Sequence, residues 1–197
     1  RNLLGREDWL KKAQRIEREI PRVESINITG DDYISPYDFI VDLETITKND
    51  DVIIPCSSGS AFTLTMSLYK PKYGQRMLTN KQLASMGYGL SGAIGAAIAK
   101  RDKRTILIEG DGGFAQNLQE VGTAKINELN LKIFIFDDQG YASIRMTQIN
   151  YFGGKYLGCD TDSGLGLPNW LKLFDAWDLP VIEINKGFVN NKEFLER

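Results

Sequence analysis

The apolar residues follow two different spacings along the chain, and the alternation of these spacings predicts the order of strands and helices. Runs of consecutive apolar residues, typical of strands covered on both faces of a sheet, occur within residues 51–56, 105–109 and 131–136. Between these runs, apolar residues recur every three or four positions, as they do on one face of a helix. This order indicates an α/β fold, with a doubly wound parallel sheet and helices on both of its faces.

Further elements extend this pattern along the chain. A brief strand is predicted at 76–79, and a strand at 180–184 is expected to close the sheet. Helices are predicted from residue 36, where Ser35 precedes a first-turn proline, and at 62–69, 114–128, 141–151 and 167–177. The helix at 114–128 and the strand at 131–136 complete a βαβ unit, which makes its two strands parallel.

The N-terminal part of the chain, residues 1–31, differs from the remainder. Residues 1–19 predict an amphipathic helix, which Pro21 ends, and the polar residues 24–32 indicate a linker. The helix is either an interface element or the last part of a preceding domain. We favour the second interpretation, because both ends of the sequence resemble cuts in a longer protein. The main domain is then expected at residues 32–197.

Glycine and alanine dominate residues 86–99. They recur at helical spacing from Gly89 to Ala97 and give a helix with a smooth face. Such a face can lie close to another backbone or to a flat ligand, and packing inside the protein explains it equally well. A membrane-spanning helix is disfavoured, because charged residues follow at 100–104.

The composition excludes several classes of function. The net charge of -2 gives no reason to expect nucleic acid or an anionic membrane as a partner. The sequence has no histidine, which excludes a Ser-His-Asp triad or a zinc-hydrolase site formed by this chain alone. Cys56 and Cys159 have no metal-binding spacing and indicate reduced thiols in a cytoplasmic protein. The chemistry therefore depends on carboxylates, a hard cation or an organic cofactor.

Acidic residues and glycines follow two of the predicted strands. The run at 105–109 leads into Gly110-Asp111-Gly112-Gly113, and the run at 131–136 leads into Asp137-Asp138-Gln139-Gly140. Because the carboxyl ends of neighbouring parallel strands meet at one edge, Asp111 and Asp138 are expected there together. Oxygen ligands without nearby histidine or cysteine select a hard cation such as Mg²⁺, and the Gly140 carbonyl offers a third ligand.

Two loops offer groups that can hold a phosphate. The glycines at 110, 112 and 113 let a diphosphate approach the amides that open the following helix. After the strand at 51–56, the loop at 57–60 combines hydroxyl residues with glycine and fits either a phosphate site or a plain turn. A metal-bridged diphosphate is the economical explanation of the acidic strand ends.

These residues resemble the cofactor signature of thiamine-diphosphate-dependent enzymes. Gly110-Asp111-Gly112 is followed, 27 residues after Asp111, by a short polar pair and a glycine. The similarity runs from about residue 35 to 184, including 83–90 and 117–120, and is greatest to the C-terminal, diphosphate-binding (PP) domain of the acetolactate synthase and pyruvate decarboxylase group. A nicotinamide-binding Rossmann domain is disfavoured, because no GxGxxG fingerprint follows the first strand.

The resemblance implies a thiamine-diphosphate-binding fold that holds thiamine diphosphate and Mg²⁺. The implied metal ligands are Asp111, Asp138 and the carbonyl of Gly140. The implied cofactor-binding residues are Gly59, Ser60, Ala84, Met86, Gly110, Asp111, Gly112, Gly113 and Tyr141. Ala84 takes the position whose carbonyl receives the aminopyrimidine group, and Met86 a position that packs against the bent cofactor.

Two positions depart from the family pattern. Asp138 stands where asparagine is usual, so the site gains a negative charge. Thr147 lies where acetolactate synthases carry a tryptophan that shapes the acceptor site, which argues against acetolactate synthesis specifically.

The resemblance also places part of the active site outside this chain. The glutamate that activates the cofactor lies on a pyrimidine-binding domain, which residues 1–31 are too few to form. We therefore assign no catalytic residue here and expect activity only with that domain, on the same gene product or another subunit. The implied enzyme is a homo-oligomeric lyase or transferase acting on a small 2-oxo acid. The alternatives are a stand-alone subunit of a two-chain 2-oxo acid decarboxylase, or a non-catalytic interaction domain with a decayed site, which Asp138 favours.

Overall fold

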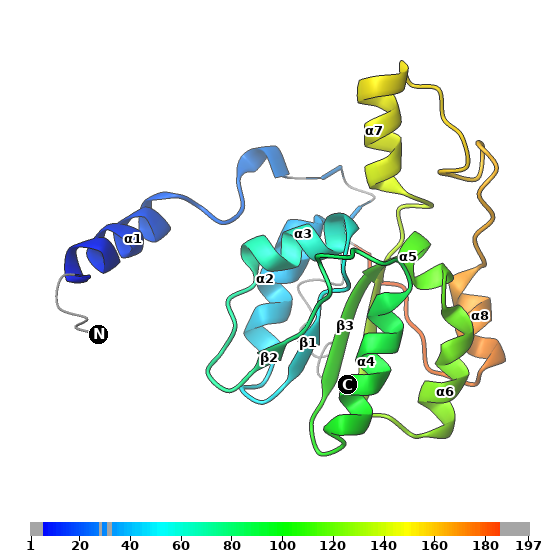
Figure 1. The fold of residues 1–197 in the computed structure, drawn as a ribbon, viewed down its shortest axis with the longest axis horizontal. Coiled ribbons are helices and arrows are strands. Elements are labelled where there is room, and N and C mark those ends of the chain that lie inside the picture. Colours follow the sequence, from blue (N-terminus) through cyan, green and yellow to red (C-terminus); the bar gives the residue numbers. More distant parts are fainter. Residues whose placement is uncertain (1–5, 28, 31–32, 186–197) are drawn as a thin grey trace.

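The computed structural model describes residues 6–27, 29–30 and 33–185, and its centre is a four-stranded parallel sheet. The strands are β1 (Val52–Ile54), β2 (Arg76–Met77), β3 (Thr105–Gly110) and β4 (Leu131–Phe136), in the order β2-β1-β3-β4 (Figure 1). All of β1 and nearly all of β3 is buried, as expected for central strands covered on both faces. The predicted α/β fold with a parallel sheet is confirmed.

The helices largely follow the predicted order. They are α1 (Glu7–Glu19), α2 (Pro36–Ile46), α3 (Gly59–Leu68), α4 (Tyr88–Ala99), α5 (Asp111–Ala115), α6 (Val121–Ile126), α7 (Ala142–Phe152) and α8 (Trp170–Ala176), with 3-10 helices η1 (Ser25–Asn27) and η2 (Leu118–Glu120). Ser35 caps α2 by accepting a hydrogen bond from the Asp38 amide, one residue before the first-turn proline. The sequence signal for this helix start therefore acts as expected.

Two hydrophobic clusters, one on each face of the sheet, hold the helices against it. On one face, α2 and α3 pack against the sheet, with Phe39 and Ile106 in the shared cluster. On the other, α4, α5, α6 and α8 pack against it, with Leu107, Phe114 and Phe174 in that cluster (Figure 1). Consecutive residues of β3 thus point into opposite clusters, as the alternation of strand side chains requires. The helices cover both faces, as the doubly wound prediction requires.

The helix predicted at 114–128 is interrupted in the structure. It is divided into α5, η2 and α6, and the first of these begins at Asp111. Asn117 leaves the helical conformation, with a φ of -144°. Its side-chain amide donates to the Ser91 hydroxyl and to the Gly87 carbonyl. These contacts with α4 and the turn before it replace the continuation of the helix.

The strand predicted at 180–184 is wrong, since residues 178–185 form neither strand nor helix. Val181 packs into the cluster on one face of the sheet and Ile184 into the cluster on the other. The side chains therefore alternate as they would in a strand. No ladder joins residues 180–185 to β4 in the described part of the chain, and a strand requires a paired backbone as well as an alternating pattern.

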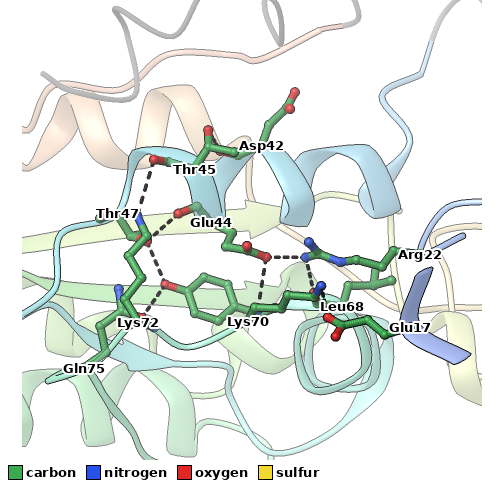
Figure 2. A network of polar contacts seen from close by, with 11 residues as sticks. Glu17, Arg22, Asp42, Glu44, Thr45, Thr47, Leu68, Lys70, Lys72 and Gln75 are labelled. Carbon is green, nitrogen blue, oxygen red and sulfur yellow. Dashed lines mark hydrogen bonds and ion pairs between the residues drawn. The ribbon is translucent and has the colours of Figure 1, made fainter. Parts of the chain in front are cut away.

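Helix α1 lies apart from the sheet and its covering helices (Figure 1). None of its residues is buried, and the Trp9 side chain is 69% exposed. Ion pairs join Glu17 to Lys70 and Arg22 to Glu44 (Figure 2). The attachment of this segment is therefore mainly polar. The assignment of residues 1–31 to a preceding domain stays a prediction, and the proposed boundary at 31–32 falls outside the described residues.

The glycine and alanine helix α4 packs inside the domain. Ala93 is buried in the cluster that covers β1 and β3, Ala96 packs against that cluster, and Ala97 is also buried. Internal packing therefore accounts for at least part of its smooth face. In the part of the chain that the structure describes, no helix is long and apolar enough to cross a membrane.

Candidate functional site

The turns that follow β3 and β4 leave the same edge of the sheet. Gly110 pairs with Phe136 at the end of the ladder, so both strands finish at the same level. Oδ2 of Asp111 accepts a hydrogen bond of 2.9 Å from the Gly140 amide. The structure therefore brings the two acidic turns into direct contact.

Asp111 is the more enclosed of the two acids. Asp111 is 1% exposed, and its Oδ1 accepts a hydrogen bond of 2.6 Å from the Gly112 amide. Burial raises the pKa of Asp111 to about 7, and the negative charge of the Asp138 carboxylate is the second cause of this rise. A cation at this position would favour the ionised acid, because it offsets both the lost hydration and the repulsion.

Asp138 lies at the rim of the site, with its side chain 39% exposed. Burial of part of the group raises the pKa of Asp138, and Arg145 opposes this shift. The Arg145 guanidinium Nη2 lies 3.4 Å from the Asp138 carboxylate and donates to the Asp138 carbonyl at 2.9 Å. Sequence reasoning missed Arg145. Its only sequence signal is its place in the first turn of the helix that follows the acidic turn.

Two glycines let the acidic turns fit together. Gly140 has a φ of 147°, and a Cβ there would lie 2.2 Å from the Cys159 carbonyl oxygen. A Cβ on Gly112 would lie 2.3 Å from the Tyr141 ring. The Tyr141 hydroxyl in turn accepts a hydrogen bond of 2.8 Å from the Gln116 side chain. Tyr141 therefore packs directly over the turn that carries Asp111.

The loop after β1 leads into α3 through exposed residues. Gly59 and Ser60 are exposed, and among the described residues no atom beyond the chain neighbours lies within 4 Å of a Cβ built on Gly59. The N-cap residue Ser58 makes no side-chain capping bond. The first amide groups of α3 therefore lack a side-chain acceptor from the cap, which leaves them open to an external one.

The segment at 79–87 lies beside this loop. The Ser57 hydroxyl donates to the Ser85 carbonyl at 2.7 Å, and the Thr79 hydroxyl donates to the Cys56 carbonyl at 2.6 Å. Ala84 has a φ of 49°, a left-handed conformation that favours glycine. Met86 is 40% exposed.

A chain of contacts connects the four segments at this edge, which are the loop after β1, the segment at 79–87 and the turns after β3 and β4. The Ser57 bond joins the loop after β1 to the segment at 79–87. A Cβ on Gly87 would lie 3.2 Å from Gln116, which follows α5, and the bond between Asp111 and Gly140 joins α5 to the turn after β4. The predicted cofactor-binding and metal-binding residues are thus gathered at one edge. Gly110 and Gly113 lie within this arrangement, at the end of β3 and in α5.

Glu109, at the end of β3, is a second residue that sequence reasoning missed. It is 3% exposed, and burial raises its pKa to about 7 against the opposing effect of the Gly89 and Leu90 amides. The sequence signal was an acidic residue at the end of an otherwise apolar run. Its carboxyl group lies at the start of α4, so that helix start is already occupied by an internal acid.

The donor set fits a hard cation that shares its ligands with a phosphate. In the described part of the chain, no three His, Cys, Asp or Glu side chains gather closely enough to hold a metal ion alone. Two carboxylates and a carbonyl form an oxygen-only set, which suits Mg²⁺ when phosphate oxygens and water complete its shell. The raised pKa values of Asp111 and Asp138 indicate negative charge that the protein only partly compensates.

Comparison with known proteins gives a consistent family. Residues 57–196 match the family described as thiamine pyrophosphate enzyme, C-terminal TPP binding domain. Chloroplastic acetolactate synthase 1 of Nicotiana tabacum is 31% identical over 160 residues, which cover 79% of this chain and 24% of that protein. The probable acetolactate synthase large subunit of Methanococcus aeolicus is 28% identical over 176 residues, 87% of this chain and 28% of that protein. The chain thus spans about a quarter of the length of these relatives.

A solved structure shares the fold. Benzoylformate decarboxylase from Polynucleobacter necessarius superposes with a TM-score of 0.73 over 90% of this chain and 33% of that chain, at 15% sequence identity. At that identity the likeness concerns the fold alone. The family match, by contrast, covers the greater part of the sequence, from the loop after β1 onward. The chain therefore belongs to the thiamine pyrophosphate enzymes and is related to their C-terminal TPP-binding domain.

Proposed function

We propose that this domain binds thiamine diphosphate through Mg²⁺, with Asp111, Asp138 and the Gly140 carbonyl as the protein's metal ligands. The observation that carries the proposal is the meeting of two carboxylates at one sheet edge, where burial and neighbouring acids raise both pKa values. Mg²⁺ commonly takes one or two carboxylates and lets phosphates supply further ligands. Its charge would offset the repulsion between the two acids.

The starts of α3 and α5 are proposed to hold the diphosphate. Gly59 and Ser60, which are exposed residues, would supply amides at the start of α3. Gly112 and Gly113, after the end of β3 at Gly110, would supply the amides of α5. Phosphate oxygens are good acceptors for the amides that open a helix. The start of α4 has no such role in this proposal, because the Gly89 and Leu90 amides there already interact with the Glu109 carboxyl group.

The segment before α4 is proposed to hold the other end of the cofactor. The Ala84 carbonyl would accept from the aminopyrimidine, and Met86 would pack against the bent cofactor, with Tyr141 near the diphosphate end. When bound, thiamine diphosphate supplies the carbanion chemistry. The residues of this chain would orient the cofactor and limit the access of water to it.

The larger function proposed is that of a lyase or transferase acting on a small 2-oxo acid, of which this domain is the C-terminal part. The coverage of about a quarter of each acetolactate synthase relative supports a partner domain in the same gene product or another subunit. The activating glutamate is assigned to that pyrimidine-binding domain, within a homo-oligomer. Two buried free cysteines are consistent with the proposed cytoplasmic location.

A non-catalytic interaction domain is the second candidate, and Arg145 favours it. The guanidinium already pairs with Asp138, so that acid has a cationic partner without a metal. Unchanged cofactor binding and activity in Asp138→Asn would remove this argument. Absence of Mg²⁺-dependent cofactor binding in the wild-type protein would support the non-catalytic candidate.

Isothermal titration of thiamine diphosphate into the full-length protein, with Mg²⁺ or with EDTA, tests the proposed function. We expect saturable binding with Mg²⁺ and at least a tenfold loss in Asp111→Asn, on the order seen when metal-site residues are altered. Asp102→Asn is the matched control, because Asp102 is an exposed acid before the opposite end of β3. Absence of metal-dependent binding by the full-length protein would overturn the proposal.

A further inference from the structure

The carboxyl group of Glu109 lies between the starts of two helices. The residue is 3% exposed at the end of β3. The Gly89 and Leu90 amides favour its charged form, but its Oε2 has no hydrogen-bond partner in the described part of the chain. A buried polar atom without a partner costs about 1–3 kcal/mol, whereas an apolar side chain of similar size avoids that cost. Packing alone therefore does not explain an acid at this position.

Two glycines make room for this carboxyl group. A Cβ on Gly89, in the first turn of α4, would lie 2.4 Å from Oε2 of Glu109. A Cβ on Gly113, in α5, would lie 3.0 Å from Oε1. For Gly95, further along α4, no atom of another described segment lies within 4 Å of the Cβ position. The close fit to the Glu109 carboxyl group thus involves both helix starts that flank it.

Each of these helix starts continues into one end of the proposed cofactor site. The first turn of α4 follows directly on the segment with Ala84 and Met86, and α5 begins at Asp111. A group wedged between the two starts therefore fixes how far apart these segments lie. Interiors are close-packed, so a change in that group is transmitted to both neighbours.

We propose that Glu109 is a positioning residue, whose carboxyl group sets the spacing between the Ala84–Met86 segment and the Asp111 turn. The inference rests on the proposed function, in which these two segments hold opposite ends of one cofactor. It assigns Glu109 no contact with the reacting atoms. A ligand that spans both segments depends on their spacing, whereas a ligand that touches one segment does not.

Two probes separate these cases in the full-length protein. Thiamine diphosphate with Mg²⁺ spans both segments, and inorganic diphosphate with Mg²⁺ needs only the metal end. In Glu109→Ala we expect the affinity for thiamine diphosphate to fall roughly ten- to hundredfold, the scale of losses when groups that orient a binding site are removed. The affinity for inorganic diphosphate should change by less than about threefold, and Glu109→Gln, which keeps the shape, should restore both.

Glycine variants of one helix provide the matched control. Gly89→Ala should reproduce the selective loss, because the new methyl group displaces the carboxyl group, whereas Gly95→Ala should not. In the Glu109→Ala background, Gly89→Ala should lower the affinity for thiamine diphosphate little further, since the space is then free. Equal weakening of both probes in Glu109→Ala, or no weakening of either, would overturn the inference.

Hydrogen exchange distinguishes failure of this inference from failure of the proposed function. If wild-type protein binds neither probe, the proposed function fails. The spacing role is then decided by amide exchange at Gly89 and Leu90 in cofactor-free protein, which should be at least about tenfold faster in Glu109→Ala. Thr105→Ala is the control, since Thr105 is equally buried at the opposite end of β3. Equal exchange in the two variants would overturn the spacing role.

Discussion

Arg145 contacts Asp138 twice, through the carboxylate at 3.4 Å and through the backbone carbonyl at 2.9 Å. The arginine therefore both neutralises an acid at the rim of the site and holds the turn that carries it. Its Nη1 also lies 3.5 Å from the Gln139 carbonyl. A guanidinium suits this position, because its several donors point in fixed directions.

The charge of Arg145 should act in opposite directions on the two ligands of the proposed site. In Arg145→Gln, we expect Mg²⁺ to bind about two- to fivefold more tightly, because a partly exposed neighbouring charge is worth about 1 kcal/mol or less. Inorganic diphosphate should bind more weakly by a similar factor. Titration calorimetry of each ligand with the full-length protein measures both effects.

Two further variants serve as controls for this prediction, one at the partner Asp138 and one at a remote arginine. In the Asp138→Asn background, the effect of Arg145→Gln on Mg²⁺ should shrink, because the two residues no longer interact. Arg101→Gln removes the same charge from a site where the side chain bonds Asn127. If Arg145→Gln weakens Mg²⁺ binding, the main role of the arginine is to order the turn.

Replacement of Glu109 by glutamine should change how stability depends on pH. The folded-state pKa of Glu109 is raised from 4.5 to about 7, so the folded chain binds the proton more tightly than the unfolded chain. The free energy of unfolding should therefore fall as the pH rises from about 4.5 to about 7, by on the order of 2–3 kcal/mol from this group. Glu109→Gln should lose that part of the decline.

Urea unfolding at pH 5 and pH 8 measures the difference between the two proteins. Asp111 titrates in the same range and is present in both, so the comparison isolates Glu109. Identical pH profiles for wild-type and Glu109→Gln would contradict the prediction.

Ala84 occupies a backbone conformation that glycine adopts at lower cost. Its φ is 49°, and the residue is exposed, so a methyl group gains little from packing. We expect Ala84→Gly to raise the free energy of unfolding by up to about 1 kcal/mol, because the relief of strain exceeds the added entropy of the unfolded chain. Ala99→Gly, in the last turn of α4, should instead lower it by about 0.5–1 kcal/mol. Equal losses at the two positions would show that Ala84 is not strained.

Gly140 should tolerate no side chain. A Cβ there meets the Cys159 carbonyl at 2.2 Å in addition to an unfavourable φ. Gly140→Ala should therefore destabilise the protein by about 2–4 kcal/mol. Gly158 also has a positive φ, but in the described part of the chain nothing beyond its chain neighbours lies within 4 Å of its Cβ position, so Gly158→Ala should cost only about 1 kcal/mol. Thermal unfolding that ranks the two variants equally would contradict the steric argument.

The sequence predicted the parts of the fold that depend on burial along the chain. The runs that form β1, β3 and β4 are continuous because the sheet is covered on both faces, and counting strands placed the turns of Asp111 and Asp138 at one edge. Pairing is not local in sequence, which is why the expected strand at 180–184 was wrong. The helix predicted at 114–128 is interrupted because the Asn117 side chain donates hydrogen bonds to residues in and before α4.

The roles of single side chains at the site depend on contacts that sequence spacing does not encode. Arg145 reaches back over the turn before its own helix, and Glu109 faces glycines of two other helices. Arg145 is an ordinary charged residue when only its neighbours in sequence are considered, and Glu109 differs only in that it ends an apolar run. Only the packing of α4, α5 and α7 around the strand ends gives them a place in the site.

The four loops at the sheet edge come from segments that are far apart in sequence, near Ser57, Ser85, Asp111 and Asp138. Their contacts with one another exist only after β1, β3 and β4 have paired. Folding is slower in proteins that depend on contacts of such high sequence separation. The affinity of this edge for any ligand is therefore a property of the completed domain, and no short peptide cut from the chain would retain it.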